Sequence, residues 1–128
     1  MVLGCGVDIV RVSHLKDACQ RWGEKFLTRV YTPRELADGQ GRSRQYEFFA
    51  ARFAAKEAII KAFGEWRGAL GLPLQAIEVL SDPTGRPIVK LSGAALQLKH
   101  RSRATDVLLS LSHTEDYAVA SAVVVRHA

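Results

Sequence analysis

The sequence predicts an α+β domain in which a mainly antiparallel sheet packs against a long central helix, with the element order β-α-α-α-β-β-α-β-β. Short apolar segments bounded by turn residues occur near both ends of the chain and in its middle, and they are typical of strands. Segments with helical spacing of apolar residues separate them, the longest at 44–63. Neither a repeat nor a linker interrupts the pattern, so we expect residues 1–128 to form a single domain.

The first half of the chain should begin with a strand at 2–9, which is apolar, contains two glycines and reaches Asp8. From Ser13 to Val30 the spacing predicts one helix face, made of Leu15, Ala18, Cys19, Trp22, Phe26, Leu27 and Val30. Residues 32–35 predict the start of a short second helix, because Thr32 and Glu35 can form a capping box around Pro33 at the first helical position. Gly39 and Gly41 should end that helix.

The second half should begin with the third helix, at about 44–63, which Gly64 ends. Strands at 74–80 and 86–91 follow, joined by a tight turn at 82–85. Ser92 is expected to cap a fourth helix that ends in a basic cluster, formed by Lys99, His100, Arg101 and Arg103. Two strands rich in Val, Leu and Ala, at 105–112 and 117–125, complete the fold.

The net charge of +5 indicates an anionic partner, which can be a nucleic acid, a membrane surface, a phosphorylated ligand or an acidic protein. No apolar run approaches the roughly 20 residues that a membrane-spanning helix needs. The first residues lack a basic segment and include Asp8 within their apolar stretch, unlike a signal peptide. We therefore expect a cytoplasmic protein that does not enter a membrane.

Charged residues in the third helix are the first candidates for a functional site. Every residue from Phe48 to Phe63 is apolar except Arg52, Lys56, Glu57 and Lys61. A helix that is apolar nearly all round is buried nearly all round, and buried charges are costly unless something pairs with them. An ordinary ion pair on a solvent-facing strip is the alternative, but the excess of positive charge favours a site for an anion.

Asp8 and His113 are two further candidates, each with a purely structural alternative. Asp8 follows an apolar strand, where it either caps the next turn or binds a hard cation such as Mg²⁺ together with phosphate oxygens. His113 closes a strand that should be buried, where histidines are more often hydrogen-bonded structural groups than catalysts.

Taken together, three segments resemble the signatures of the 4'-phosphopantetheinyl transferases. They are Gly4-x-Gly6-Val7-Asp8-Ile9-Val10, Phe53-Ala54-Ala55-Lys56-Glu57-Ala58 and Ser112-His113-Thr114. The likeness extends over essentially the whole chain and includes the turn Thr84-Gly85-Arg86-Pro87. The short length resembles the branch of this family that serves the acyl carrier proteins of fatty-acid biosynthesis, whereas the double-length branch mainly serves polyketide and non-ribosomal peptide carriers.

The resemblance implies a transferase fold and activity, with coenzyme A as co-substrate. It implies that Asp8 and Glu57 bind Mg²⁺, and that Arg52, Lys56, Lys61 and His113 line the coenzyme A phosphates. Mn²⁺ prefers the same oxygen ligands and is the alternative metal. The family also implies a homotrimer with active sites between subunits, and a first helix that docks the acidic carrier protein.

The basic residues of the expected first helix agree with that docking role. Arg21, Lys25 and Arg29 recur at four-residue spacing, and like charges at this spacing destabilise a helix. A solvated basic stripe is the alternative. His14 stands where the family usually has arginine, so its contact with the carrier should be weaker or dependent on pH. The loop at 64–71 also departs from the family's short glycine-rich form, and we assign no ligand-binding residue there.

The expected reaction is attack of a carrier serine on the β-phosphate of coenzyme A, with 3',5'-ADP leaving. Lys61, Lys56 and Arg52 would add fixed positive charge. A metal-bound water beside Glu57 is the expected general base, and His113 is the second choice. Two rival functions stay open: a basic RNA-binding module, which leaves Asp8 and Glu57 unexplained, and another coenzyme A-dependent transferase such as an acyltransferase, which needs no metal.

Overall fold

The computed structural model describes residues 1–64 and 72–128, and it confirms the α+β class. The element order is β1 (Val2–Arg11), α1 (Val12–Trp22), α2 (Glu24–Val30), α3 (Pro33–Gly39), α4 (Gln45–Ala62), a 3-10 turn η1 (Leu74–Ala76), β2 (Ile77–Ser81), β3 (Pro87–Leu91), α5 (Gly93–Ser102), β4 (Asp106–His113) and β5 (Tyr117–Val125). The residues 65–71, which include most of the loop discussed above, lie outside the described part of the chain.

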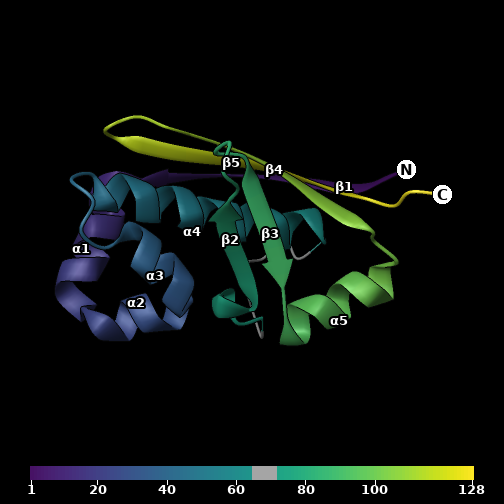
Figure 1. The fold of residues 1–128 in the computed structure, drawn as a ribbon, viewed down its shortest axis with the longest axis horizontal. Coiled ribbons are helices and arrows are strands. Elements are labelled where there is room, and N and C mark those ends of the chain that lie inside the picture. The colour runs from purple at the N-terminus through teal and green to yellow at the C-terminus, as the bar shows by residue number, and fades with distance from the viewer. Residues whose placement is uncertain (65–71) are drawn as a thin grey trace.

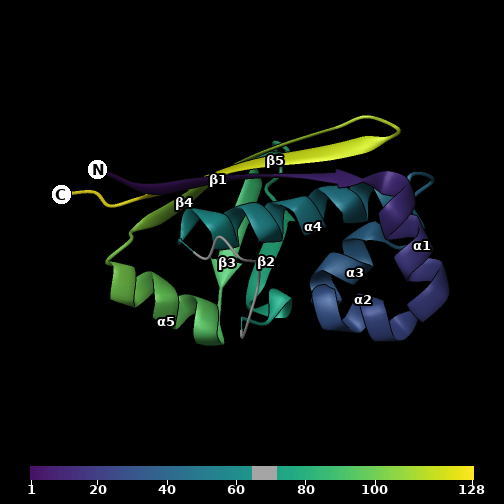
Figure 2. The same cartoon turned by 180° about the vertical axis from the view of Figure 1, so that it is seen from behind.

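The strands form two antiparallel sheets rather than one. β1, β5 and β4 make a three-stranded sheet with β5 in the centre, and β2 pairs with β3 as a separate hairpin. Figures 1 and 2 show the three-stranded sheet along one side of α4 and the hairpin crossing the same helix on another side. Helices α1–α3 gather at one end of the molecule, and α5 lies at the other.

The expected single helix from Ser13 to Val30 is wrong, because the chain breaks at Gly23 into α1 and α2. Gly23 has a φ of 55°, a left-handed conformation that glycine adopts without steric cost. The break adds a helix to the predicted order. It also leaves Trp22 60% exposed, although the spacing had assigned this side chain to the buried face.

Local signals located the shorter elements correctly. The capping box at Thr32 forms, with Glu35 N–H donating to Thr32 Oγ1 and Thr32 N–H donating to Glu35 Oε1. The turn at 82–85 has Gly85 at a φ of 88°, as expected. Ser92 occupies the N-cap position of α5, but in the described chain its side chain makes no capping hydrogen bond.

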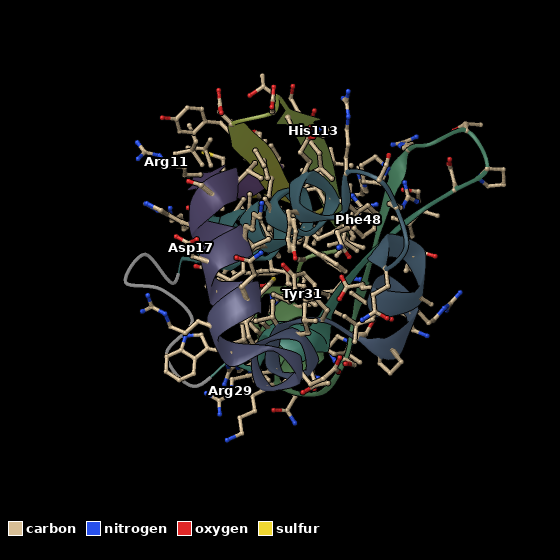
Figure 3. All side chains as sticks on the ribbon, turned by 90° about the vertical axis from the view of Figure 1, so that its left-hand side faces the viewer. Arg11, Asp17, Arg29, Tyr31, Phe48 and His113 are labelled. Atoms are coloured by element: carbon tan, nitrogen blue, oxygen red, sulfur yellow. The ribbon has the colours of Figure 1, made fainter. Side chains whose placement is uncertain are left out.

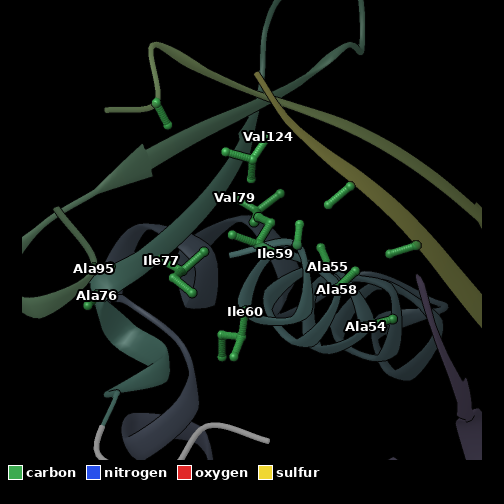
Figure 4. Packing of buried hydrophobic residues seen from close by; sticks show 14 residues of the cluster. Ala54, Ala55, Ala58, Ile59, Ile60, Ala76, Ile77, Val79, Ala95 and Val124 are labelled. Carbon is green, nitrogen blue, oxygen red and sulfur yellow. The ribbon is translucent and has the colours of Figure 1, made fainter. Parts of the chain in front are cut away.

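The core is built around α4, as its apolar composition predicts. Alanine and isoleucine side chains of α4, including Ala55, Ala58 and Ile59, contact Val79 of β2 and Val124 of β5 in one buried cluster (Figure 4). Among the described residues, no helix combines the length and apolar character that crossing a membrane would require. Since α4 contacts both sheets, most of its residues are buried.

Candidate active site

β1 lies so close to α4 that their backbones touch. A Cβ atom at Gly4 would lie 2.1 Å from Ala62 O, and one at Gly6 would lie 2.2 Å from Ala58 O. Such distances exclude any side chain larger than hydrogen at either position. The two glycines therefore bring Asp8, which follows them on the same strand, within reach of the last turns of α4.

Asp8 and Lys61 form an ion pair at this contact. Lys61 Nζ lies 3.0 Å from Asp8 Oδ1 and also donates to Val7 O at 3.1 Å. The side chains of Asp8 and Lys61 are 18% and 28% exposed, so water screens the pair only partly. The pair fixes the lysine charge beside the carboxylate at the open edge of β1.

Glu57 lies one helical turn before Lys61 and is the second carboxylate near Asp8. Burial raises the pKa of its carboxyl, the negative charge of Asp8 raises it further, and Lys61 acts in the opposite direction. Two carboxylates that destabilise each other's charge can be stabilised by a bound cation. In the described parts of the chain, no cluster of three or more acidic, histidine or cysteine side chains could hold a metal. The donor set of two carboxylates fits Mg²⁺, which usually takes one or two protein carboxylates and completes its shell with phosphate oxygens and water.

A cavity of about 690 Å³ opens on a different side of α4. Most of its polar lining is basic. The polar and aromatic side chains around it are Arg42, Ser43, Arg44, Phe48, Arg52, Ser81, Ser110 and His113. They come from the segment before α4, from α4 itself, from the end of β2 and from the end of β4.

Arg52 forms the inner wall of this cavity and is only 8% exposed. It donates from Nη2 to Ser81 Oγ at 3.0 Å, and its guanidinium lies 4.5 Å from the centre of the Phe48 ring. Arg42 lies over the same ring at 4.5 Å. Burial lowers the pKa of Arg52, although Glu35 partly opposes this, and its Nε has no hydrogen-bond partner among the described residues. A buried cation with an unsatisfied donor indicates a site for an anionic ligand.

His113 lies at the rim of the same cavity, close to Phe48 (Figure 3). Its Nδ1 is 3.1 Å from Glu47 Oε1, while the imidazole side chain remains 46% exposed. The carboxylate of Glu47 is 11% exposed, and its other oxygen lies 3.8 Å from Arg44 Nε. The sequence analysis missed Glu47, although an acid near the start of an otherwise apolar helix was a usable signal.

The structure thus gathers the predicted residues into two groups. Asp8, Glu57 and Lys61 form the carboxylate group at β1, whereas Arg52 and His113 belong to the basic cavity. Arg52 and Lys61 are nine positions apart on α4, which at 3.6 residues per turn turns their side chains about 180° from each other. β5 also separates β1 from β4 in the sheet. The two groups therefore face different sides of one chain.

Lys56, which was predicted to line the coenzyme A phosphates, lies in neither group in the structure. The side chain is fully buried, and Nζ donates to Glu35 Oε1 at 2.8 Å, to Leu74 O at 3.0 Å and to Ile77 O. An ammonium group has three hydrogens, so these bonds use its full donor capacity. Lys56 joins α4 to α3 and to the start of β2, and we leave it out of the site.

The predicted docking residues are all exposed at the helical end of the molecule. His14 and Arg21 lie on α1, whereas Lys25 and Arg29 lie on α2 beyond the break at Gly23. Trp22, Lys25, Phe26 and Arg29 line a shallow hollow of about 380 Å³. In Figure 3, Arg29 lies at the opposite side of the view from His113, so this surface is distinct from the basic cavity.

Comparisons with known proteins agree with this architecture. A model described as the 4'-phosphopantetheinyl transferase superfamily matches residues 4–122. The holo-[acyl-carrier-protein] synthase of Desulforudis audaxviator is 45% identical over 125 residues, covering 98% of this chain and 94% of the relative. The enzyme of the same name from Koribacter versatilis is 45% identical over 124 residues, covering 96% of this chain and 98% of the relative.

Solved structures agree over the same length. The holo-[acyl-carrier-protein] synthase of Neisseria meningitidis superimposes with a TM-score of 0.87 at 31% identity, covering 98% of this chain and all of that one. The Helicobacter pylori synthase, solved in complex with coenzyme A, superimposes with a TM-score of 0.82 at 27% identity, covering 94% and 99%. On these matches the chain belongs to the holo-[acyl-carrier-protein] synthase family of the 4'-phosphopantetheinyl transferase superfamily.

Proposed function

We propose that this protein transfers the 4'-phosphopantetheine arm of coenzyme A to a serine of an apo-acyl carrier protein, giving the holo-carrier and 3',5'-ADP. The observation that carries the proposal is the pairing of a carboxylate group, which suits a cation, with a basic cavity that suits phosphates. The relatives of full length carry the name of this reaction. Neither rival function accounts for both halves, since RNA does not require the carboxylates and acyl transfer does not require a metal.

Asp8 and Glu57 are the residues that would hold Mg²⁺, with Mn²⁺ as the alternative. When bound, the metal would polarise the diphosphate and neutralise charge on the leaving oxygen. Lys61 holds its ammonium group beside Asp8, where it adds fixed positive charge at the reacting phosphate. A water beside Glu57 is the proposed general base, and His113 is the second candidate for this role.

Arg52 and His113 bind the phosphate groups of coenzyme A in the basic cavity, and Arg42 and Arg44 add to the positive potential there. The buried guanidinium of Arg52 is preorganised by Ser81 and Phe48, so little side-chain entropy is lost when a phosphate binds. Its unsatisfied Nε gains a partner in the same step if a ligand oxygen or a water reaches it.

A homotrimer with sites between subunits would bring the two groups together. One chain presents them on different sides of α4, and a second copy that supplies one of them would let one ligand contact both. The outer face of the three-stranded sheet supports such assembly. Val7 and Ile9 are 60% and 63% exposed on it, and Cys5, Val123 and Leu108 are paired across its three strands. An apolar sheet face of this kind is a candidate interface.

The acyl carrier protein would dock on the exposed basic residues of α1 and α2, namely His14, Arg21, Lys25 and Arg29. Their charges suit an acidic partner, and they increase the rate of encounter. The cytoplasm is the expected location, as a prediction from the sequence.

Mass spectrometry tests the reaction directly. An apo-acyl carrier protein incubated with this protein, coenzyme A and Mg²⁺ should gain the mass of one 4'-phosphopantetheine on a serine. The same mixture with EDTA should show no gain. A carrier that stays unmodified under all conditions would contradict the proposal, and modification in EDTA would favour a transferase without a metal.

A further inference from the structure

Glu47 is a nearly buried acid that lies between two basic residues of the cavity. Its Oε1 is 3.1 Å from His113 Nδ1, and its Oε2 is 3.8 Å from Arg44 Nε. His113 comes from the end of β4 and Arg44 from the segment before α4, so one carboxylate connects two separate segments of the cavity wall.

A structural explanation accounts for only part of this arrangement. Glu47 is in the first turn of α4, where a negative charge is stabilised by the helix dipole. That effect needs no burial and no particular partner, whereas Glu47 is 11% exposed with its oxygens toward His113 and Arg44. Burying a carboxylate is costly, and the cost is offset here by groups that line the cavity.

The contact with His113 determines which imidazole nitrogen can meet a ligand. An ionised carboxylate only accepts hydrogen bonds, so Nδ1 carries the hydrogen that is donated to Glu47. Nε2 is then the nitrogen left for a ligand in the cavity, and it can donate to a phosphate oxygen when it carries a hydrogen as well. A carboxylate that engages one ring nitrogen also restricts rotation of the ring, as such partners do for metal-binding histidines.

We propose that Glu47 is a positioning residue that acts through His113 and fixes its Nε2 toward the phosphate groups of coenzyme A. The inference rests on the proposed function for the identity of the ligand. Glu47 orients Arg44 less strongly than His113. The Arg44 side chain is 78% exposed, and its separation of 3.8 Å from Glu47 is long for a hydrogen bond.

A double-mutant cycle on binding tests this role. The affinity for coenzyme A and for 3',5'-ADP is measured by calorimetry for wild type, Glu47→Ala, His113→Ala and the double variant. We expect Glu47→Ala to weaken binding about tenfold in the wild-type background and no more than about twofold when His113 is already absent. Glu47→Gln can still accept a hydrogen bond through its amide oxygen, so its loss should be smaller than that of Glu47→Ala.

Glu115→Gln is the matched control, because it removes the same charge from an exposed acid in the hairpin that follows His113. Its affinity for coenzyme A should stay within about twofold of wild type, as expected for an exposed charge. Nitrogen NMR of His113 gives a readout independent of activity: with coenzyme A bound, Nδ1 and Nε2 should both carry a hydrogen in wild type, and the hydrogen-bonded Nδ1–H signal should be lost in Glu47→Ala. The carrier KM should be unchanged in all these variants.

Additive losses in the cycle, or a Glu47→Ala variant that binds coenzyme A like wild type, would overturn the inference. If Glu47→Ala does not fold, the same cycle with Glu47→Gln decides the question. Wild-type protein that fails to bind coenzyme A would contradict the proposed function, whereas binding with additive losses contradicts only the role of Glu47.

Discussion

Asp8 on β1 and Lys61 on α4 form an ion pair of 3.0 Å, although 53 positions separate them in the chain. The contact depends on Gly4 and Gly6, which let the strand approach the helix backbone. Burial raises the pKa of Glu57, and because Glu57 lies one turn before Lys61, the same approach brings the Asp8 carboxylate close enough to raise it further. The proximity of Asp8, Glu57 and Lys61 therefore depends on the close packing of the β1 and α4 backbones.

Removal of either carboxylate should abolish most activity. Asp8→Ala and Glu57→Ala are each expected to lose roughly a hundredfold or more, because a missing ligand forfeits several kcal/mol of charge stabilisation. Both should stay folded by circular dichroism, since neither side chain is part of the core. Asp106→Ala, which removes an exposed acid at the start of β4, is the control and should remain active. Full turnover by either site variant, or by wild type in EDTA, would exclude the metal-dependent mechanism.

Glu57→Gln should stabilise the metal-free protein at neutral pH. Burial and the charge of Asp8 raise the pKa of Glu57, so the folded chain binds a proton here more tightly than the unfolded chain does. Ionisation at higher pH therefore lowers the free energy of unfolding of wild type, and the neutral glutamine avoids this loss. The advantage in thermal midpoint should be present at pH 7 and disappear as the pH falls through about 4, where glutamate is neutral in both states. An advantage that is constant from pH 4 to pH 7 would mean that the charge is not its cause.

Lys56→Met should destabilise the fold rather than act on coenzyme A. It leaves Glu35 buried without its cation, although Thr32 N–H and Val79 N–H still donate to this carboxylate. Breaking a buried pair in this way costs about 3–5 kcal/mol. Denaturant unfolding should show this loss, and the Lys56→Met/Glu35→Gln double variant should recover part of it. A Lys56→Met variant with wild-type stability and weak coenzyme A binding would return Lys56 to the phosphate site.

Charge reversal on the docking surface should affect the carrier alone. Changing Arg21, Lys25 and Arg29 together to glutamate should raise the carrier KM at least tenfold and leave coenzyme A affinity nearly unchanged, because the cofactor charges lie elsewhere. The wild-type carrier KM should rise with salt, which screens exposed charges over about 8 Å at physiological ionic strength.

The matched control reverses the same number of charges in and just after α5, at the other end of the molecule, at Lys99, Arg101 and Arg103. This variant has the same net charge as the docking variant, so it separates a local contact from a general electrostatic effect. Equal losses in the two variants, or a KM that does not respond to salt, would contradict docking at α1 and α2.

The sequence predicted best those features whose determinants lie close together in the chain. The capping box at Thr32 needs only Glu35 three residues later, and the turn at Gly85 needs only its own glycine. The helix break at Gly23 was not predicted, because the apolar spacing continues past it to Phe26 and Val30. The same spacing does not reveal that Trp22 is exposed.

The division of the strands into two sheets depends on pairing across the chain, which the sequence does not record. Val2 is paired with Val125, for example, so no local pattern identifies β5 as the partner of β1. The roles of Lys56 and Lys61 were equally hard to separate. Both lie on α4, five positions apart, and the buried partners of Lys56, above all Glu35 from α3, come from distant segments of the chain.

The opposite orientation of Arg52 and Lys61 on α4 has a consequence for mixtures of inactive chains. Asp8→Ala retains an intact basic cavity, and Arg52→Ala retains an intact carboxylate group. If each site takes its two halves from different subunits, co-refolding equal amounts of the two variants should restore activity, with about one site in four wild type by random assortment in a ring. Each variant alone should remain nearly inactive, and a mixture no better than its components would mean that every chain works with its own two halves. With sites shared in this way, two defective copies of one gene would complement each other, because residues nine positions apart on α4 point to opposite sides of the helix.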